Sequence, residues 1–142
     1  MADISIPPVA IEEENVALSL ITLRDVQPLI PPRLAETHKG TYGHVGVIAG
    51  APGRSGAAVL AARGAIRGGA GLVTVMTDAE TAKLVHAGSI ESMTYSGKDL
   101  DEFLKNKDAV VIGPGMATDR KIVDRIDAMT EKKPLIAQAQ AT

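Results

Sequence analysis

Short, mainly apolar runs alternate along the chain with longer stretches in which apolar residues recur every three or four positions. Four runs stand out, at residues 44–49, 71–76, 109–113 and 134–137, and a weaker one lies at 91–95. Short apolar runs rich in Val, Ile and Leu are typical of strands buried on both faces of a parallel sheet. We therefore predict five strands, beginning at residue 44.

The stretches between these runs have helical spacing. We predict helices over 56–67, 79–87, 99–106 and 119–131, the second capped by Asp78. The first helix would bury a face formed by Val59, Leu60, Ala62, Ala65 and Ile66. Strict alternation of strand and helix predicts an α/β fold, with a mostly parallel sheet covered by helices on both faces.

Residues 1–38 have a different character. They are rich in proline and acidic residues, as in "SIPPV", "EEEN" and "LIPPRL". Proline fixes φ and removes a backbone donor, so we interpret this segment as a linker or extended arm. Within it, "LSLITLRDVQPLI" allows one short helical turn or strand. The folded domain would then occupy residues 39–142.

Composition narrows the function classes. The chain has 142 residues, 45% of them hydrophobic, a net charge of −2 and no cysteine. It shows no basic stripe for a nucleic-acid partner, and no thiolate can hold a metal or form a disulfide. We see no signal peptide or membrane-length apolar run. We expect a cytoplasmic protein with neither a nucleic-acid nor a membrane partner.

Two glycine-rich loops follow the first and fourth predicted strands: "AGAPGRSG" (49–56) and "GPGMATD" (113–119). In open parallel sheets, ligands bind beyond the carboxyl ends of the strands. Both loops lead from such an end toward a predicted helix. We therefore predict that residues 50–57 and 113–117 lie side by side at one edge of the sheet and line one cleft.

The glycine spacing fits neither of the common phosphate-binding motifs. Ala57 stands where a P-loop would have its lysine, and Gly50, Gly53 and Gly56 lack the Gly-x-Gly-x-x-Gly spacing of dinucleotide-binding turns. Two interpretations stay open. The amides that begin the helix at Gly56 bind an anion, or the glycines serve only a tight turn.

Few single residues suggest chemistry. Lys39, in "HKGTYGH", is able to neutralise a phosphate, and Arg54 either reaches an anion near the first loop or remains solvated. His38 and His44 lack the spacing of a metal pair and have no carboxylate cluster beside them. From the residues alone we predict no metal site and no catalytic residue.

Taken together, these motifs resemble the start of the ADP- or ATP-dependent NAD(P)H-hydrate dehydratases. That family has a ribokinase-like, three-layer αβα fold, and its members are often the C-terminal half of a bifunctional repair enzyme with an epimerase domain. The resemblance rests on residues 38–75 and on "VVIGPGMA" at 110–117. By the same resemblance, "ADISIPP" (2–8) looks like the tail of the epimerase domain.

The resemblance implies a reaction and a set of contacts. In the family, ADP or ATP with Mg²⁺ phosphorylates the hydroxyl of hydrated NADH or NADPH, and elimination of phosphate restores the reduced cofactor. It implies that Ala57 and Gly115 bind the hydrated dinucleotide and that the protein is a homo-oligomer. We add Gly56 and Lys39 as further predicted substrate-binding residues. The consumed nucleotide would bind elsewhere.

The chain also departs from the family pattern. The His-Pro-Gly and Gly-Thr-Gly-Asp motifs do not occur within its 142 residues, and Gln138 and Gln140 stand where the family has acids. Glutamine cannot act as a base near neutral pH. We therefore expect the N-terminal half of a dehydratase domain, inactive alone. Two alternatives remain: a sugar or vitamin kinase of the same fold, and a non-catalytic binding or assembly module.

Overall fold

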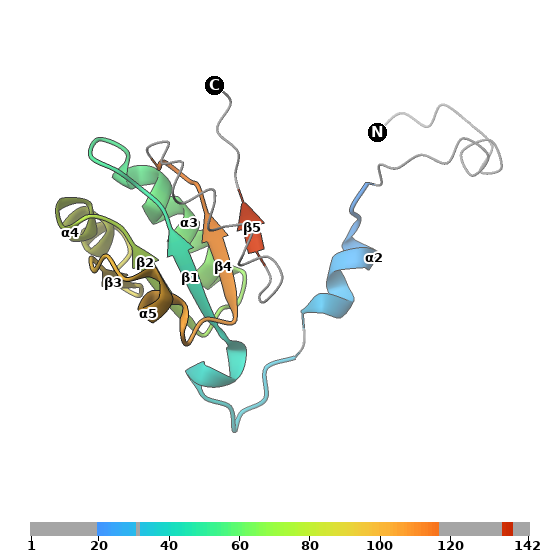
Figure 1. The fold of residues 1–142 in the computed structure, drawn as a ribbon. Coiled ribbons are helices and arrows are strands. Elements are labelled where there is room, and N and C mark those ends of the chain that lie inside the picture. Colours follow the sequence, from blue (N-terminus) through green and yellow to red (C-terminus); the bar gives the residue numbers. More distant parts are fainter. Residues whose placement is uncertain (1–19, 31, 117–134, 138–142) are drawn as a thin grey trace, which may run out of the picture. The chain divides into compact units, whose positions relative to one another are not determined.

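The computed structural model describes residues 20–30, 32–116 and 135–137 (Figure 1). The chain divides into two compact units, Met1–Ala35 and Glu36–Thr142. Each unit is described here by itself. Among the described residues, no helix is both long and apolar enough to span a membrane.

The larger unit is built on a five-stranded sheet with the strand order β3-β2-β1-β4-β5 (Figure 1). All four pairings between neighbouring strands are parallel, which confirms the predicted parallel α/β sheet. Each predicted strand is present. The strands are β1 His44–Ile48, β2 Leu72–Met76, β3 Met93–Tyr95, β4 Ala109–Ile112 and β5 Leu135–Ala137.

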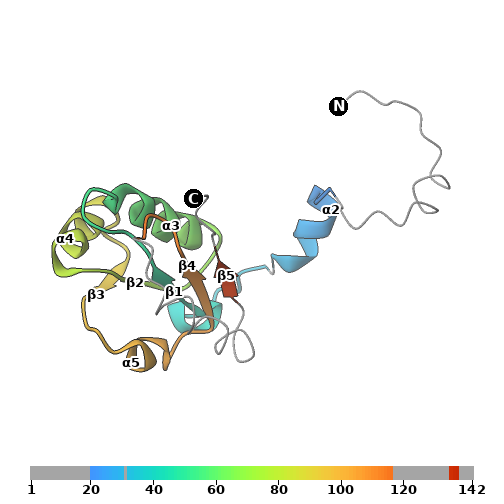
Figure 2. The ribbon, with the colours of Figure 1, turned by 45° about the horizontal axis from the view of Figure 1, so that its top comes forward.

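Helices cover both faces of this sheet. They are α3 (Ser55–Arg67), α4 (Ala79–Gly88) and α5 (Leu100–Leu104). Figure 2 shows α3 and α4 on one side of the strands and α5 on the other. The three layers confirm the predicted αβα architecture. The helix predicted over 119–131 lies outside the described residues.

The strands supply two separate cores because their side chains alternate between the faces. Val47 and Ala49 of the β1 segment, with Val73 and Val75 of β2, pack against α3 and α4. On the opposite face, Ile48, Val110 and Ile112 pack against Leu100 and Phe103 of α5. A Cβ at Gly46 would lie 3.1 Å from the Phe103 ring, so glycine lets this ring approach the sheet.

Aspartate caps begin α4 and α5, and of these the sequence predicts the cap of α4, Asp78. Asp78 Oδ1 accepts hydrogen bonds from the amides of Glu80 (3.1 Å) and Thr81 (3.0 Å). Asp99 Oδ1 accepts one from the amide of Glu102 at 3.0 Å. Hydrogen bonds from Thr81, followed by that from Glu80, hold the pKa of Asp78 below 3.8. Both helices therefore start on an anionic oxygen, which suits the positive end of the helix dipole.

Within residues 20–30 and 32–35, the described part of the smaller unit, there is one short helical segment. Here α2 (Leu23–Val26) runs into a 3₁₀ turn, η1 (Gln27–Leu29). Its start is stabilised by Asp25, whose Oδ2 accepts from both the amide and the hydroxyl of Thr22 at 2.7 Å. The helical alternative predicted for this segment is therefore the one observed. The assignment of residues 1–38 as an arm from a preceding domain stays a prediction.

Candidate functional site

The two glycine loops meet at the carboxyl edge of the sheet. Strands β1 and β4 pair in parallel with Ile48 opposite Ile112, so both chains leave the sheet at the same level. The amide of Gly113 donates to the carbonyl of Ile48 at 3.1 Å, and the amide of Gly50 donates to the carbonyl of Pro114 at 2.8 Å. The predicted juxtaposition of the loops is confirmed for residues 50–57 and 113–116.

Gly115 of the second loop lies directly against the first turn of α3. Its φ is +67°, a conformation that favours glycine. A Cβ at this position would lie 2.7 Å from the Ala57 Cβ and 2.9 Å from the carbonyl oxygen of Arg54. Two of the predicted binding residues, Ala57 and Gly115, are therefore packed together, and any larger side chain at Gly115 would push the loops apart.

Arg54 links the loops a second time. Its Nη1 donates to the carbonyl oxygen of Met116 at 3.1 Å. From the sequence, Arg54 is expected either near an anion or in solvent, and this link is not predictable because its partner is 62 residues away. Composition and spacing carry no signal for a contact of this kind. Only the strand order, which places β4 beside β1, brings Met116 within reach.

The start of α3 is suited to an anion. Arg54 is its N-cap residue, and no side chain caps the helix or places an acid in its first turn. This differs from α4 and α5, which begin on Asp78 and Asp99. Free amides at a helix start, with the positive end of the dipole, bind phosphate groups well. Gly56 lies in this turn, and a Cβ there would meet nothing within 4 Å, so the surface beside it is open.

One further polar group lies beside the first loop. The Thr77 Oγ1 atom is buried and has no hydrogen-bond partner among the described residues. A Cβ at Gly50 would lie 3.4 Å from it. Thr77 directly follows β2, so it stands at the same edge of the sheet as the loops. A buried hydroxyl without a partner is costly, so this atom is a candidate hydrogen-bonding group for a ligand or water.

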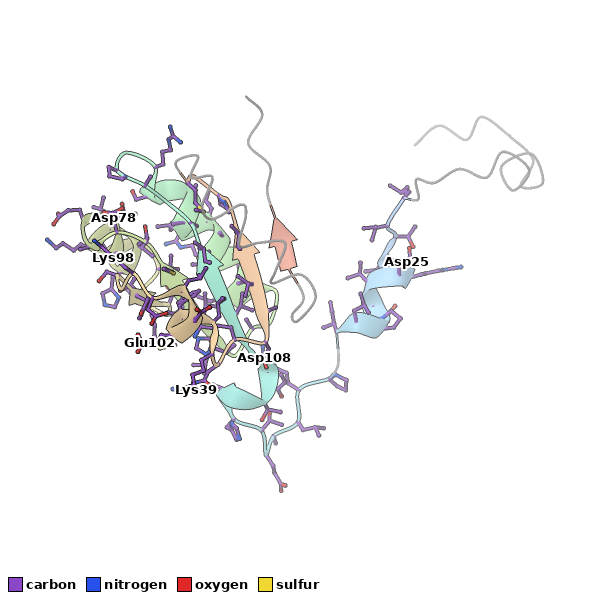
Figure 3. The ribbon with its side chains drawn as sticks, viewed as in Figure 1. Asp25, Lys39, Asp78, Lys98, Glu102 and Asp108 are labelled. Atoms are coloured by element: carbon purple, nitrogen blue, oxygen red, sulfur yellow. The ribbon has the colours of Figure 1, made fainter. Side chains whose placement is uncertain are left out.

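Lys39 lies at the other end of the sheet. It begins a 3₁₀ turn, η2 (Lys39–Tyr42), just before β1. A Cβ at Gly71, next to the start of β2, would overlap the carbonyl oxygen of Lys39. Figure 3 shows Lys39 near Asp108, where β1 begins. The length of β1, about 16 Å at ~3.3 Å per residue, separates it from the loops. The structure thus brings together Gly56, Ala57 and Gly115 but not Lys39.

His44 forms hydrogen bonds within the fold at the end of the sheet where Lys39 lies. Its Nε2 and the Thr74 Oγ1 are 2.7 Å apart, and its backbone amide donates to Asp108 Oδ2 at 2.7 Å. Burial, followed by the positive charge of Lys107, lowers the pKa of His44 below 6.5, although Asp108 opposes the shift. Within the part of the chain that the structure describes, no group of three His, Asp or Glu side chains is arranged to hold a metal ion.

Comparison with known proteins points to one family. The family model described as NAD(P)H-hydrate dehydratase matches residues 45–141. Over 100 residues, 68% of the chain, the sequence is 44% identical to the bifunctional NAD(P)H-hydrate repair enzyme Nnr of Coxiella burnetii, of which it covers 20%. It is 32% identical to the enzyme of the same name from Moorella thermoacetica, covering 99% of this chain and 29% of that protein.

A solved structure agrees. The ADP/ATP-dependent NAD(P)H-hydrate dehydratase from Bacillus subtilis, co-crystallised with ATP and Mg²⁺, aligns with a TM-score of 0.69 and 29% identity. The alignment covers 83% of this chain and 44% of that one. The chain thus spans less than half the length of each of these three proteins. On the matched residues, the parallel sheet and the paired glycine loops, the chain belongs to the NAD(P)H-hydrate dehydratase family.

Proposed function

We propose that this chain supplies the dinucleotide-binding part of an NAD(P)H-hydrate dehydratase, and that hydrated NADH or NADPH binds on the two glycine loops. The observation that carries the proposal is the contact between Ala57 and Gly115 beside the uncapped start of α3. Small side chains allow a ligand to approach the backbone closely, and free amides favour its phosphate groups. Gly56 lies at the open side of the same turn.

The role of the chain in the reaction is to bind and orient. The nucleotide, ADP or ATP, would transfer phosphate to the ring hydroxyl, and the loss of that phosphate would leave NADH or NADPH. The described residues contain no ligand set for Mg²⁺, and we assign no step to the ion. A base for the hydroxyl proton is not assigned either, since Gln138 and Gln140 cannot serve as one.

The non-catalytic module remains a second candidate, and the two glutamines favour it. It would use the same loops and bind the same ligand without converting it. A cytoplasmic location, a homo-oligomeric state and a fused or adjacent epimerase domain remain predictions. So does a ligand contact for Lys39, which would have to lie at the opposite end of β1.

The proposal is tested by following the backbone amides of the ¹⁵N-labelled chain during titration with hydrated NADPH. We expect saturable shifts centred on Gly56, Ala57 and Gly115. Unhydrated NADPH and a simple sugar are the comparison ligands, the latter for the kinase alternative. Shifts confined to the surroundings of Lys39, or saturation by the sugar alone, would contradict the proposal.

A further inference from the structure

We infer that Arg54 is a positioning residue, whose side chain holds the second glycine loop against α3 so that the two loops form one binding surface. The inference rests on the proposed function only for what the surface binds. The interaction of Arg54 with the second loop is present in the protein without ligand. It consists of the contacts that Arg54 makes with residues 115 and 116.

Arg54 meets the second loop through its backbone and its side chain. The Nη1 atom donates to the Met116 carbonyl at 3.1 Å. Gly115 packs over the backbone of Arg54, because a Cβ there would lie 2.9 Å from the Arg54 carbonyl oxygen and 3.3 Å from its Cβ. The same carbonyl accepts from the amide of Ala57 at 3.3 Å. Arg54 is thus in contact with the loop residue and with the helix turn that the proposed ligand touches.

The Arg54 side chain fastens one end of the turn 113–116, and a backbone hydrogen bond fastens the other end. The amide of Met116 donates to the carbonyl of Gly113 at 3.0 Å, which closes the turn 113–116. The Gly50 amide, donating to Pro114 at 2.8 Å, fastens the base of this turn to the first loop. The Arg54 side chain fastens its far end. Two anchored ends define the orientation of Gly115, and a loop ordered before binding pays less entropy when the ligand arrives.

A direct role for the arginine on a ligand phosphate makes different demands. Positioning needs a hydrogen-bond donor of suitable length, whereas a phosphate contact of this kind depends on the positive charge. Arg54→Ala removes both the donor and the charge, so amide exchange in the chain without ligand, which a phosphate contact does not affect, distinguishes the two roles. Arg63 offers a matched control, because it is an exposed arginine on the same helix.

The experiment compares Arg54→Ala and Arg63→Ala in the 142-residue chain with the unaltered chain. Amide hydrogen exchange without ligand is measured at Gly50 and Met116, and the Kd for hydrated NADPH is measured by calorimetry. We expect Arg54→Ala to speed exchange at both amides and to raise the Kd by about 3- to 10-fold, the usual range for one net hydrogen bond. Arg63→Ala should show neither effect.

The readouts separate two kinds of failure. Unchanged exchange at Gly50 and Met116 in Arg54→Ala overturns the positioning role. A raised Kd together with unchanged exchange assigns the arginine to the ligand itself. If exchange rises as expected but the unaltered chain does not bind hydrated NADPH, the proposed function fails while the positioning role stands.

Discussion

Two glycines with left-handed backbone conformations allow the cost of backbone strain to be distinguished from the cost of overpacking. Gly53 (φ +79°) and Gly115 (φ +67°) lie in the two loops, but only Gly115 has neighbours within reach of a Cβ. We predict that Gly115→Ala lowers the free energy of unfolding by about 1–3 kcal/mol more than Gly53→Ala, because overpacking adds to the backbone strain that both changes share. Urea unfolding of the two variants measures the difference. Equal losses would mean that the loops do not pack as described.

Histidine 44 gives a prediction about pH. Its pKa is below 6.5 in the folded chain, mainly because of burial and Lys107. As the pH falls below 6.5, the His44 imidazole is protonated in the unfolded chain before it is protonated in the folded chain. The stability that is present above that pH is therefore lost. We predict that His44→Gln weakens this acid-side loss, because the amide can still bond to Thr74 but does not titrate. Unfolding at a series of pH values tests it, with His86→Gln as the comparison. An unchanged acid limb in His44→Gln would contradict it.

Individual residues were predictable where the cause is local. Asp78 could be identified as a cap because a cap and its partners lie within three residues of each other. Arg54 could not be interpreted, since its partner comes from another strand. Lys39 is near the first loop in sequence, but a strand lies between them and carries the chain across the sheet. A contact of this type depends on topology, which residue types do not encode.

At the level of elements, apolar periodicity predicted every described strand and the helices α3, α4 and α5. The boundaries differ by one or two residues, as at β3, which begins at Met93 instead of residue 91. The strand order was not predictable. Runs such as "VGVI" and "AVVI" are apolar on both faces and show only that they are central. After β3 the chain crosses to the opposite face of the sheet as α5. This crossing brings β4 back to pair with β1.

Helices α3 and α4 lie on the same face of the sheet, and two glycine-to-alanine substitutions in them should have opposite effects on stability. A Cβ at Gly64 in α3 would meet nothing within 4 Å, whereas one at Gly88 in α4 would lie 2.8 Å from the Val59 Cγ2. We predict that Gly64→Ala stabilises the fold by about 0.5–1 kcal/mol through helix propensity. Gly88→Ala should destabilise it by about 1–3 kcal/mol, because Val59 is a stiff neighbour. Thermal unfolding checks both signs, and stabilisation by Gly88→Ala would show that α3 and α4 are not closely packed.

At the scale of the whole molecule, we expect the chain to bind the hydrated cofactor without converting it. We predict that the 142-residue chain does not restore NADH from its hydrate when ADP or ATP and Mg²⁺ are supplied. The reason is chemical, because the glutamines at 138 and 140, where the resemblance implies acids, cannot act as a base and the Gly-Thr-Gly-Asp motif does not occur in these 142 residues. The measurement is the recovery of reduced-nicotinamide absorbance against a control without protein. Nucleotide-dependent recovery would show that a residue we have not identified acts as the base.

The central claim is that the paired glycine loops bind the hydrated dinucleotide, and Ala57 tests it most directly. Its Cβ packs against Gly115, so the larger side chain of Ala57→Leu should push the second loop away from α3. Arg63→Leu places the same side chain on an exposed position of the same helix. Both variants should first be shown to be folded by their unfolding midpoints.

The decisive measurement is the Kd for hydrated NADPH, determined by calorimetry on the unaltered chain and on these two variants. We predict that Ala57→Leu raises the Kd about tenfold or more, since overpacking of ~1–3 kcal/mol falls directly on the binding surface. Arg63→Leu should leave the Kd unchanged. If a folded Ala57→Leu chain binds as tightly as the unaltered one, the loops are turns that serve only the backbone, and the ligand does not bind there.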